Sequence, residues 1–196
     1  MKKRILPLLL VMVLLLAALS VTAIAAETPI EPNNASAYAN AEMKGKFGPE
    51  YPVTQYCPVC NAEKKWYPLD KGMTGTGVID YNHYYLLANI THTGSGFYRI
   101  PSGKTVCMYM NGYNISSEAY IAVQVLDGTF NVIGNGTETI SGGGLNSPVY
   151  GAAFDIRGGA LNLYGVNVTK TPGTTRSGPT IGMNEAAGTL NVYNRQ

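Results

Sequence analysis

Gly128-Thr-Phe-Asn-Val-Ile-Gly134 is the first of three copies of one pattern, followed by Gly159-Ala-Leu-Asn-Leu-Tyr-Gly165 and Gly188-Thr-Leu-Asn-Val-Tyr-Asn194. Within each copy apolar side chains alternate with a central Asn, and this period of two residues is typical of a β-strand. The leading glycines, with Gly103 of a looser upstream copy, are 25, 31 and 29 residues apart. A repeat of about 30 residues indicates a solenoid, in which each copy stacks on the next.

Further short strands flank each copy. Pairs of apolar or alternating residues precede the copies, and we align them as Tyr98/Ile100, Val123/Val125, Phe154/Ile156 and Met183/Glu185. Val166 and Val168 mark a third strand, so each coil contains about three strands. Because no helical spacing of apolar residues is sustained after Tyr84, we predict an all-β fold, a right-handed parallel β-helix (solenoid) of about four coils. The alignment turns Glu185 inward, where an unpaired carboxylate is costly, so we expect a frayed last coil.

Several motifs resemble those of a known family. They are Ser102-Gly-Lys-Thr-Val-Cys-Met-Tyr-Met-Asn-Gly-Tyr-Asn-Ile115, Ile140-Ser-Gly-Gly-Gly144, His83-Tyr-Tyr-Leu86, and Cys57-Pro-Val-Cys60 followed by Trp66. From Tyr56 to the end, the chain resembles right-handed parallel β-helix proteins of the pectin-lyase-like group, above all repetitive surface proteins of Gram-positive anaerobic bacteria. The resemblance implies the fold and carries little information on activity, because these residues shape coils.

The N-terminus has the pattern of a bacterial export signal. Lys2, Lys3 and Arg4 precede an apolar run that ends at Ala23-Ile24-Ala25, a small-residue cleavage site. We therefore expect a signal peptide over 1–25, with an uncleaved membrane anchor as the alternative. The remaining parts are a flexible, disordered spacer (26–55), an N-terminal cap with the C-x-x-C (56–82) and the coils (83–196), the last of them incomplete.

Removal of the signal changes the charge of the chain. The full sequence has 14 Lys and Arg against 12 Asp and Glu, and loss of Lys2, Lys3 and Arg4 leaves 11 against 12. The mature protein therefore has no basic excess that would favour nucleic acid or an anionic membrane. We expect a secreted protein, extracellular or cell-wall associated, with no membrane contact after signal cleavage.

Cys57 and Cys60 are the candidate metal ligands. A C-x-x-C is half of a zinc knuckle or a redox pair, and a structural zinc site needs four ligands. The other candidate ligands are Cys107, His83 and His92. Because only two ligands are close in sequence, we favour a local disulfide or two reduced thiols, with Cys107 as a packed thiol in mid-strand, and expect no cofactor. Zinc at Cys57 and Cys60 is the alternative.

The coils show no catalytic pattern. Their carboxylates are scattered over the sequence: Asp80, Glu118, Asp127, Glu138, Asp155 and Glu185. Neither a pair for glycoside hydrolysis nor an acidic cluster for calcium-dependent lysis is visible. We align Asp155 with Gln124 and Asn184 at an outward position and expect it to be solvated. The histidines have ordinary explanations as polar strand or turn residues, so we predict no catalytic residue.

The candidate ligand-binding residues are two outward columns. Stacking aligns Asn131, Asn162 and Asn191, and beside them Ile133, Tyr164 and Tyr193. Amides next to aromatic rings can bind sugar hydroxyls and stack on sugar rings. The alternative is a ladder of Asn side chains that stabilises the stack by its own hydrogen bonds.

The function that we expect is that of a non-catalytic exported β-helix module for cell-surface adhesion or glycan contact. Its partners would be extracellular glycans, or a further β-helix segment at the open C-terminal end. The alternatives are a structural fragment of a larger repetitive surface protein, and a carbohydrate-active lyase or hydrolase.

Overall fold

A computed structural model describes residues 52–79, 81–118, 120–143, 152–171, 180–183 and 188–193. The expected signal peptide lies outside these residues, as does most of the spacer, although the first strand already begins at Val53. Every regular element of the described residues is a β-strand. Among them no helix is long and apolar enough to span a membrane. The prediction of an all-β fold is confirmed.

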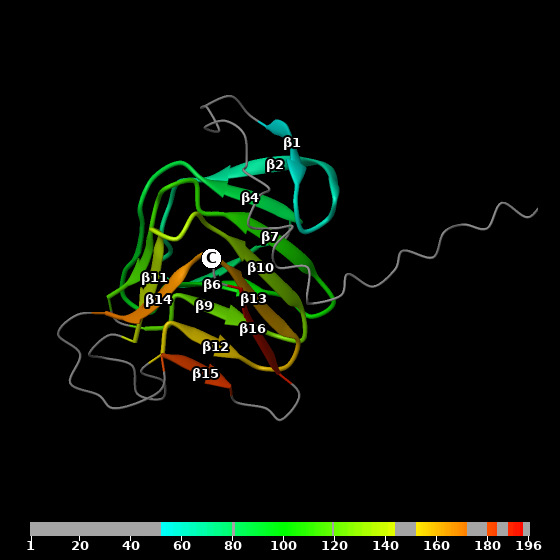
Figure 1. Cartoon of the computed structure of the whole chain (residues 1–196). Helices are drawn as coiled ribbons and strands as arrows, with labels where there is room; N and C mark the ends of the chain where they lie inside the picture. The colour runs from blue at the N-terminus through cyan, green and yellow to red at the C-terminus, as the bar shows by residue number, and fades with distance from the viewer. Residues whose placement is uncertain are drawn as a thin grey trace, which may run out of the picture. The chain divides into compact units, whose positions relative to one another are not determined.

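Three sheets share the strands, and Figure 1 shows their arrangement. A seven-stranded sheet contains, in spatial order, β1 (Val53–Cys57), β2 (Ala62–Leu69), β4 (His83–Leu86), β7 (Thr105–Tyr109), β10 (Thr129–Ile133), β13 (Ala160–Tyr164) and β16 (Thr189–Tyr193). A four-stranded sheet contains β14 (Asn167–Lys170), β11 (Thr139–Gly142), β8 (Ile115–Ser117) and β5 (Ile90–His92). A five-stranded sheet contains β15 (Ile181–Met183), β12 (Phe154–Ile156), β9 (Val123–Val125), β6 (Phe97–Ile100) and β3 (Thr76–Val78).

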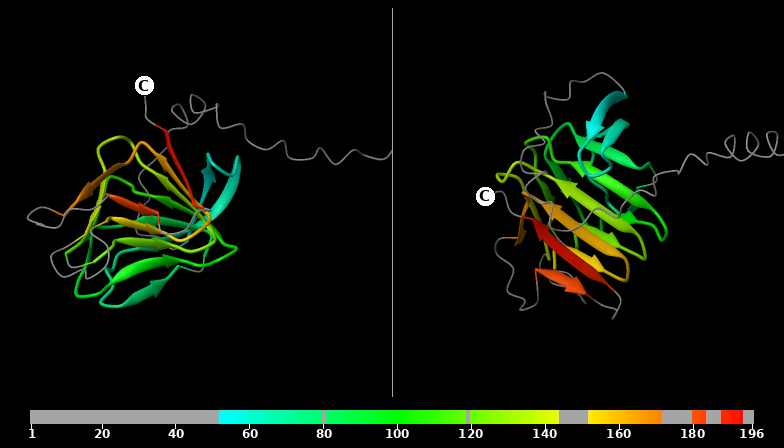
Figure 2. Two further views of the ribbon diagram at one scale, coloured as in Figure 1. Left: turned by 90° about the horizontal axis from the view of Figure 1, so that it is seen from below. Right: turned by 45° about the vertical axis from the view of Figure 1, so that its right-hand side comes forward.

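The chain visits the three sheets in turn and so forms a parallel β-solenoid of about four turns. Each turn contains three strands, and each strand pairs in parallel with its equivalent in the next turn, as in β7, β10 and β13. In Figure 2 the colours run in order along the stack, from the cyan β1–β2 hairpin to the red β16. The hairpin is the exception to the parallel pattern, because β1 pairs antiparallel with β2.

Vertical columns of apolar side chains fill the interior. Phe130 stacks between Val106 and Leu161, and Leu161 is followed by Leu190 in the same register. A second column on the four-stranded sheet is almost uniform, with Ile90, Ile115, Ile140 and Val168 in register. Both columns belong to one core cluster, in which most members are fully buried. The predicted register of Phe130, Leu161 and Leu190 is therefore confirmed.

The predicted register of the last coil is wrong by two residues. Phe154 pairs with Ile181 and Ile156 with Met183, so Ile181 and Met183 take the positions that we assigned to Met183 and Glu185. Asp155 accordingly faces Gly182, not Asn184. The misalignment arose because five residues separate β15 from β16, whereas three residues separate β9 from β10 and β12 from β13. The length of such a connection cannot be inferred from strand periodicity. Glu185 itself lies outside the described residues.

One corner of the solenoid requires glycine. Gly159 precedes β13 with a φ of +67°, in the left-handed region. A Cβ atom there would lie 2.0 Å from the carbonyl oxygen of Gly128, the glycine stacked below it. Neither the backbone conformation nor the space admits another residue, which explains why Gly opens these copies of the repeat.

Interior side chains become accessible at the last described strands. Val192 continues the column of Val132 and Leu163, which are 0% and 2% exposed, yet it is 54% exposed. Met183 is 47% exposed, although its partner Ile156 is fully buried. No described strand pairs with the outer edges of β15 and β16.

This gradient predicts unequal costs for the same substitution. Leu161→Ala should lower the free energy of unfolding by about 3 kcal/mol, because a fully buried leucine leaves a cavity. Leu190→Ala, in the same column but only partly buried, should cost about 1 kcal/mol. Urea unfolding of the full chain and both variants measures the difference. Equal losses would contradict the assignment of β16 to the accessible end.

Candidate functional site on the outer face of the seven-stranded sheet

One column of side chains runs along the outer face of the seven-stranded sheet. On each strand it alternates with interior residues, so it points away from the core. The strand register aligns His83 of β4, Cys107 of β7, Asn131 of β10, Asn162 of β13 and Asn191 of β16. The predicted Asn column is therefore in register, and its N-terminal continuation is a cysteine and a histidine.

The β1–β2 hairpin brings two more cysteines to this face. Cys57 ends β1, and Cys60 lies in the turn that leads to β2. Asn61 completes the turn in the left-handed conformation, with a φ of 50°. The hairpin packs its apolar side chains against those of the outer face, including Tyr85 and Ile133. This packing places the C-x-x-C turn directly over β4 and β7.

Four donor atoms meet at this point. The Sγ atoms of Cys57, Cys60 and Cys107 and a ring nitrogen of His83 all lie within 4.8 Å of one another. Cys60 Sγ is 3.3 Å from His83 Nε2 and 3.9 Å from Cys107 Sγ. We call these four residues the Cys3His cluster. It is the only group of three or more His, Cys, Asp or Glu residues in the described ranges whose donor atoms are arranged to hold a metal ion.

The Cys3His cluster is shielded from solvent. Cys57, His83 and Cys107 are buried, and Cys60 is half-buried. The ring of Trp66 packs edge-on against His83, with ring centroids 4.9 Å apart. Contacts with Cys107, Cys57 and His83 hold the pKa of the Cys60 thiol well below its usual range. The pKa values of the neighbouring Cys57 and Cys107 thiols are raised by their contacts within the cluster and by burial, so the cluster favours a single thiolate, at Cys60.

The Asn column is a continuous hydrogen-bonded ladder. Asn191 donates from Nδ2 to Oδ1 of Asn162, and Asn162 donates in the same way to Asn131, both at 2.8 Å. Asn131 in turn points its Nδ2 at Cys107 Sγ, 3.6 Å away. Asn131 is buried, whereas Asn162 and Asn191 are half-buried. The ladder thus joins the accessible end of the outer face to the Cys3His cluster.

A second outer column consists mainly of tyrosines. Tyr85, Tyr109, Ile133, Tyr164 and Tyr193 lie in register beside the first column. The last two rings are stacked with centroids 4.7 Å apart and an interplanar angle of 5°. Both are half-buried, which leaves part of this aromatic surface accessible to solvent.

A polar groove runs along the corner where these strands begin. It has a volume of about 370 Å³, and Lys104, Thr105, Asp127, Thr129 and Thr189 are among its lining residues. Thr105, Thr129 and Thr189 are the first residues of β7, β10 and β16. The hydroxyl groups therefore lie at the starts of these strands, and the ammonium and carboxylate groups lie in the turns that precede β7 and β10.

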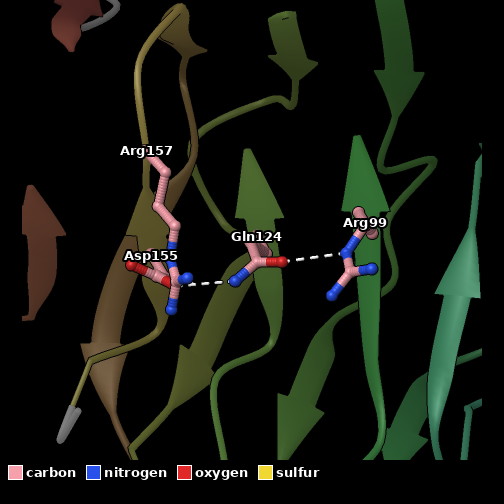
Figure 3. Close-up of polar contacts among 4 residues, drawn as sticks. All are labelled: Arg99, Gln124, Asp155 and Arg157. Atoms are coloured by element: carbon pink, nitrogen blue, oxygen red, sulfur yellow. Dashed lines mark hydrogen bonds and ion pairs between the residues drawn. The ribbon is translucent and has the colours of Figure 1, made fainter. Parts of the chain in front are cut away.

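Asp155 is not solvated as we expected but fully buried. Figure 3 shows it in a row of polar side chains on neighbouring strands of the five-stranded sheet. Arg157 Nε lies 2.9 Å from Asp155 Oδ2, which also accepts from Gln124 Nε2 at 2.8 Å. Gln124 Oε1 accepts from Arg99 Nε. The row neutralises the carboxylate and satisfies its oxygen, which allows burial.

Glu138 is a second buried carboxylate with a structural role. Its two oxygens accept the backbone N–H groups of Gly112 and Asn135, at 3.1 and 2.8 Å. Its backbone carbonyl accepts the N–H of Asn167 in the next turn of the solenoid. Glu138 therefore links three successive turns.

His92, the other candidate ligand, is not part of the Cys3His cluster. It lies at the end of β5, fully buried, with its ring edge-on against Tyr98. Its Nδ1 accepts the N–H of Met73 at 2.9 Å. Burial lowers the pKa of His92 to about 4.

The alternation of the strands already contained a signal that Cys107 and His83, two of the candidate ligands, lie on the same outer face. Val106 and Met108 are interior residues, so Cys107 between them had to point outward. His83 and Cys107 are direct register partners. The contact of these two with the hairpin turn had no signal in the sequence, because it depends on the hairpin folding over the sheet.

No family model matches the chain, and no match was found among curated proteins or solved structures. The assignment of the chain as a β-solenoid is therefore based on the strand register described above. None of these comparisons links the chain to the pectin-lyase-like group.

The buried His92 predicts an acid-sensitive fold. The pKa is about 4 in the folded protein and about 6.5 in the unfolded chain, so stability from this residue is complete above pH 6.5 and is lost as the pH falls. The loss should reach roughly 3 kcal/mol near pH 4. Unfolding free energies of the full chain and of His92→Gln should diverge in their pH dependence over this window. Parallel pH profiles would contradict the prediction.

Proposed function

We propose that this chain is an exported, non-catalytic β-solenoid module that contacts extracellular glycans or surfaces through the accessible half of its outer sheet face. The parallel stack of Tyr164 and Tyr193 beside Asn162 and Asn191 is the observation that carries the proposal. Burial decreases along the Asn column away from the hairpin, so this half of the face is available to a partner. The proposal that the protein is exported is based on the N-terminal sequence, which has the pattern of a signal peptide.

The chemistry of this surface suits sugars. A side-chain amide has two N–H donors and an oxygen with two lone pairs, and a ladder bond uses one donor and one lone pair of each inner residue. The remaining capacity of Asn162 and Asn191 is matched to sugar hydroxyls. Aromatic rings next to such amides provide a flat apolar surface for the C–H face of a sugar ring. The hydroxyl-lined groove at the start of the same strands adds further polar contacts.

The positions of the buried acids favour binding over catalysis. Asp155 is engaged by Arg157 and Gln124, and Glu138 by two backbone N–H groups. Glycoside hydrolysis needs a pair of carboxylates that flank the scissile bond. Asp155 lies on β12 of the five-stranded sheet, whereas Glu138 immediately precedes β11 of the four-stranded sheet. The proposed relationship to pectin-lyase-like surface proteins of Gram-positive bacteria fits a binding role of this kind.

A glycan array tests the proposal. The full chain should bind a subset of glycans, and Tyr164→Ala/Tyr193→Ala should weaken that binding by about 10-fold or more, because two stacking rings are lost. Tyr81→Ala is the matched control, since Tyr81 is an exposed tyrosine outside the Asn and Tyr columns. Absence of binding, or equal binding by the double variant and the full chain, would refute the proposal.

A second candidate function is assembly with another solenoid segment. The exposed Val192 and Met183 favour it, because they extend interior columns that a further strand layer would bury. Such a partner would pair with the outer edges of β15 and β16. In this way the chain would form one structural segment of a larger repetitive surface protein.

Assembly is measured by light scattering after size-exclusion chromatography. We expect the signal-free exported protein to associate with increasing concentration, and Val192→Lys to reduce this association, because the ammonium cannot be buried in the stack. A monomer at all concentrations would exclude self-stacking of the chain.

A further inference from the structure

We propose that Cys57, Cys60, His83 and Cys107 bind one Zn²⁺ ion as a closed tetrahedral centre, which fastens the β1–β2 hairpin to the outer face of the seven-stranded sheet. This inference goes beyond the proposed function and is independent of it. The glycan-contact residues Tyr164 and Tyr193 are not part of the Cys3His cluster.

The geometry of the donor atoms fits zinc. With Zn–S bonds of about 2.3 Å and a Zn–N bond of about 2.05 Å, a tetrahedral ion needs S–S separations of about 3.8 Å and S–N separations of about 3.6 Å. Cys60 Sγ lies 3.9 Å from Cys107 Sγ and 3.3 Å from His83 Nε2. All four donor atoms are within 4.8 Å of one another, so small side-chain movements complete the tetrahedron.

The kind of donor selects the metal. Three thiolates and an imidazole form a soft set without oxygen ligands, which disfavours Ca²⁺ and Mg²⁺. Four protein ligands leave no open position for water or substrate, as in structural rather than catalytic zinc sites. Burial of Cys57, His83 and Cys107 agrees with a structural site. Binding exchanges the protons of the thiols for the ion and involves no oxidation.

A disulfide explains the arrangement less well. The chain has three cysteines, all three are free thiols in the structure, and their sulfur atoms converge on one point. A bond between any two would leave the third sulfur in the cluster together with His83. A metal ion is the one partner that uses all four side chains at once.

Two neighbouring side chains contact the proposed ligands Cys107 and His83. Asn131 directs an N–H at Cys107 Sγ, and hydrogen bonds of this kind stabilise a metal-bound thiolate. Trp66 packs against the His83 ring and limits its rotation. Asn131 would therefore act as a positioning residue, held in place by Asn162.

The centre would connect parts of the chain that are far apart in sequence. His83 is 23 residues and Cys107 47 residues from Cys60. The ion would join three segments of the chain. They are the β1–β2 hairpin, the first residue of β4 and the middle residue of β7. A metal that binds the folded chain stabilises it by mass action. Removal of zinc should therefore release the hairpin from the sheet.

Metal analysis of the full chain, purified with a thiol reductant, tests the site directly. We expect one zinc per chain, and Co²⁺ in its place should give the intense visible bands of a tetrahedral thiolate complex. Chelation should lower the melting temperature by about 10 °C and make all three thiols reactive to alkylation. Zinc well below one equivalent together with no tetrahedral Co²⁺ spectrum would overturn the proposal, as would iron in place of zinc.

The zinc affinities of single variants distinguish the proposed ligands from residues that only lie near them. His83→Gln should reduce zinc affinity by about 100-fold, whereas the matched control His92→Gln should retain full affinity in a chelator competition. Asn131→Ala should reduce affinity by about 10-fold and shift the Co²⁺–thiolate charge-transfer band, and Asn162→Ala should change both less. Retention of wild-type affinity by His83→Gln would refute the site. A Cys57–Cys60 disulfide in the exported protein isolated without reductant would refute it as well.

Discussion

Parallel pairing of each strand with its equivalent in the next turn is the constraint on which the whole molecule depends. The backbone hydrogen bonds hold Val106, Phe130, Leu161 and Leu190 in one vertical line, and the same bonds hold every other position of these strands in lines of their own. Interior lines must be apolar, since one coil cannot bury its inner face alone. Outer lines are freed from that requirement, and their chemistry differs from turn to turn. On one such line the chain places histidine, then cysteine, then three asparagines.

Periodicity within strands was enough to predict the architecture, because alternation and repeat length are local properties of the sequence. It identified the interior line through Phe130, Leu161 and Leu190 and the outer Asn line correctly. It failed at β15, where Ile181 and Met183 occupy the inward positions, because a connection can change length while the strands that it joins stay in register. Burial of Asp155 was also missed, since it depends on the ion pair with Arg157 together with a hydrogen bond from Gln124 on the neighbouring strand.

The Cys3His cluster shows a different limit of prediction. Cys107 and His83 were each recognisable as outward residues, and the C-x-x-C was a recognisable turn. What joins them is the antiparallel β1–β2 hairpin, which folds back over the sheet and covers β4 and β7. That fold-back depends on the apolar cluster that contains Cys57, Trp66 and Tyr85, whose members are far apart in sequence and follow no period.

The ladder of amides has a direction, and the sulfur at its end determines it. Cys107 Sγ accepts, so Asn131 must turn its nitrogen toward it and its oxygen toward Asn162. Asn162 is then obliged to face the same way, and so is Asn191. Reversal of the Asn162 amide would set its oxygen against Asn131 Oδ1 on one side and its nitrogen against Asn191 Nδ2 on the other. The contact with Cys107 beneath the hairpin thus sets the orientation of amides up to three turns away. As a result, the last amide of the row, Asn191, presents its carbonyl oxygen and not its amino group at the accessible end.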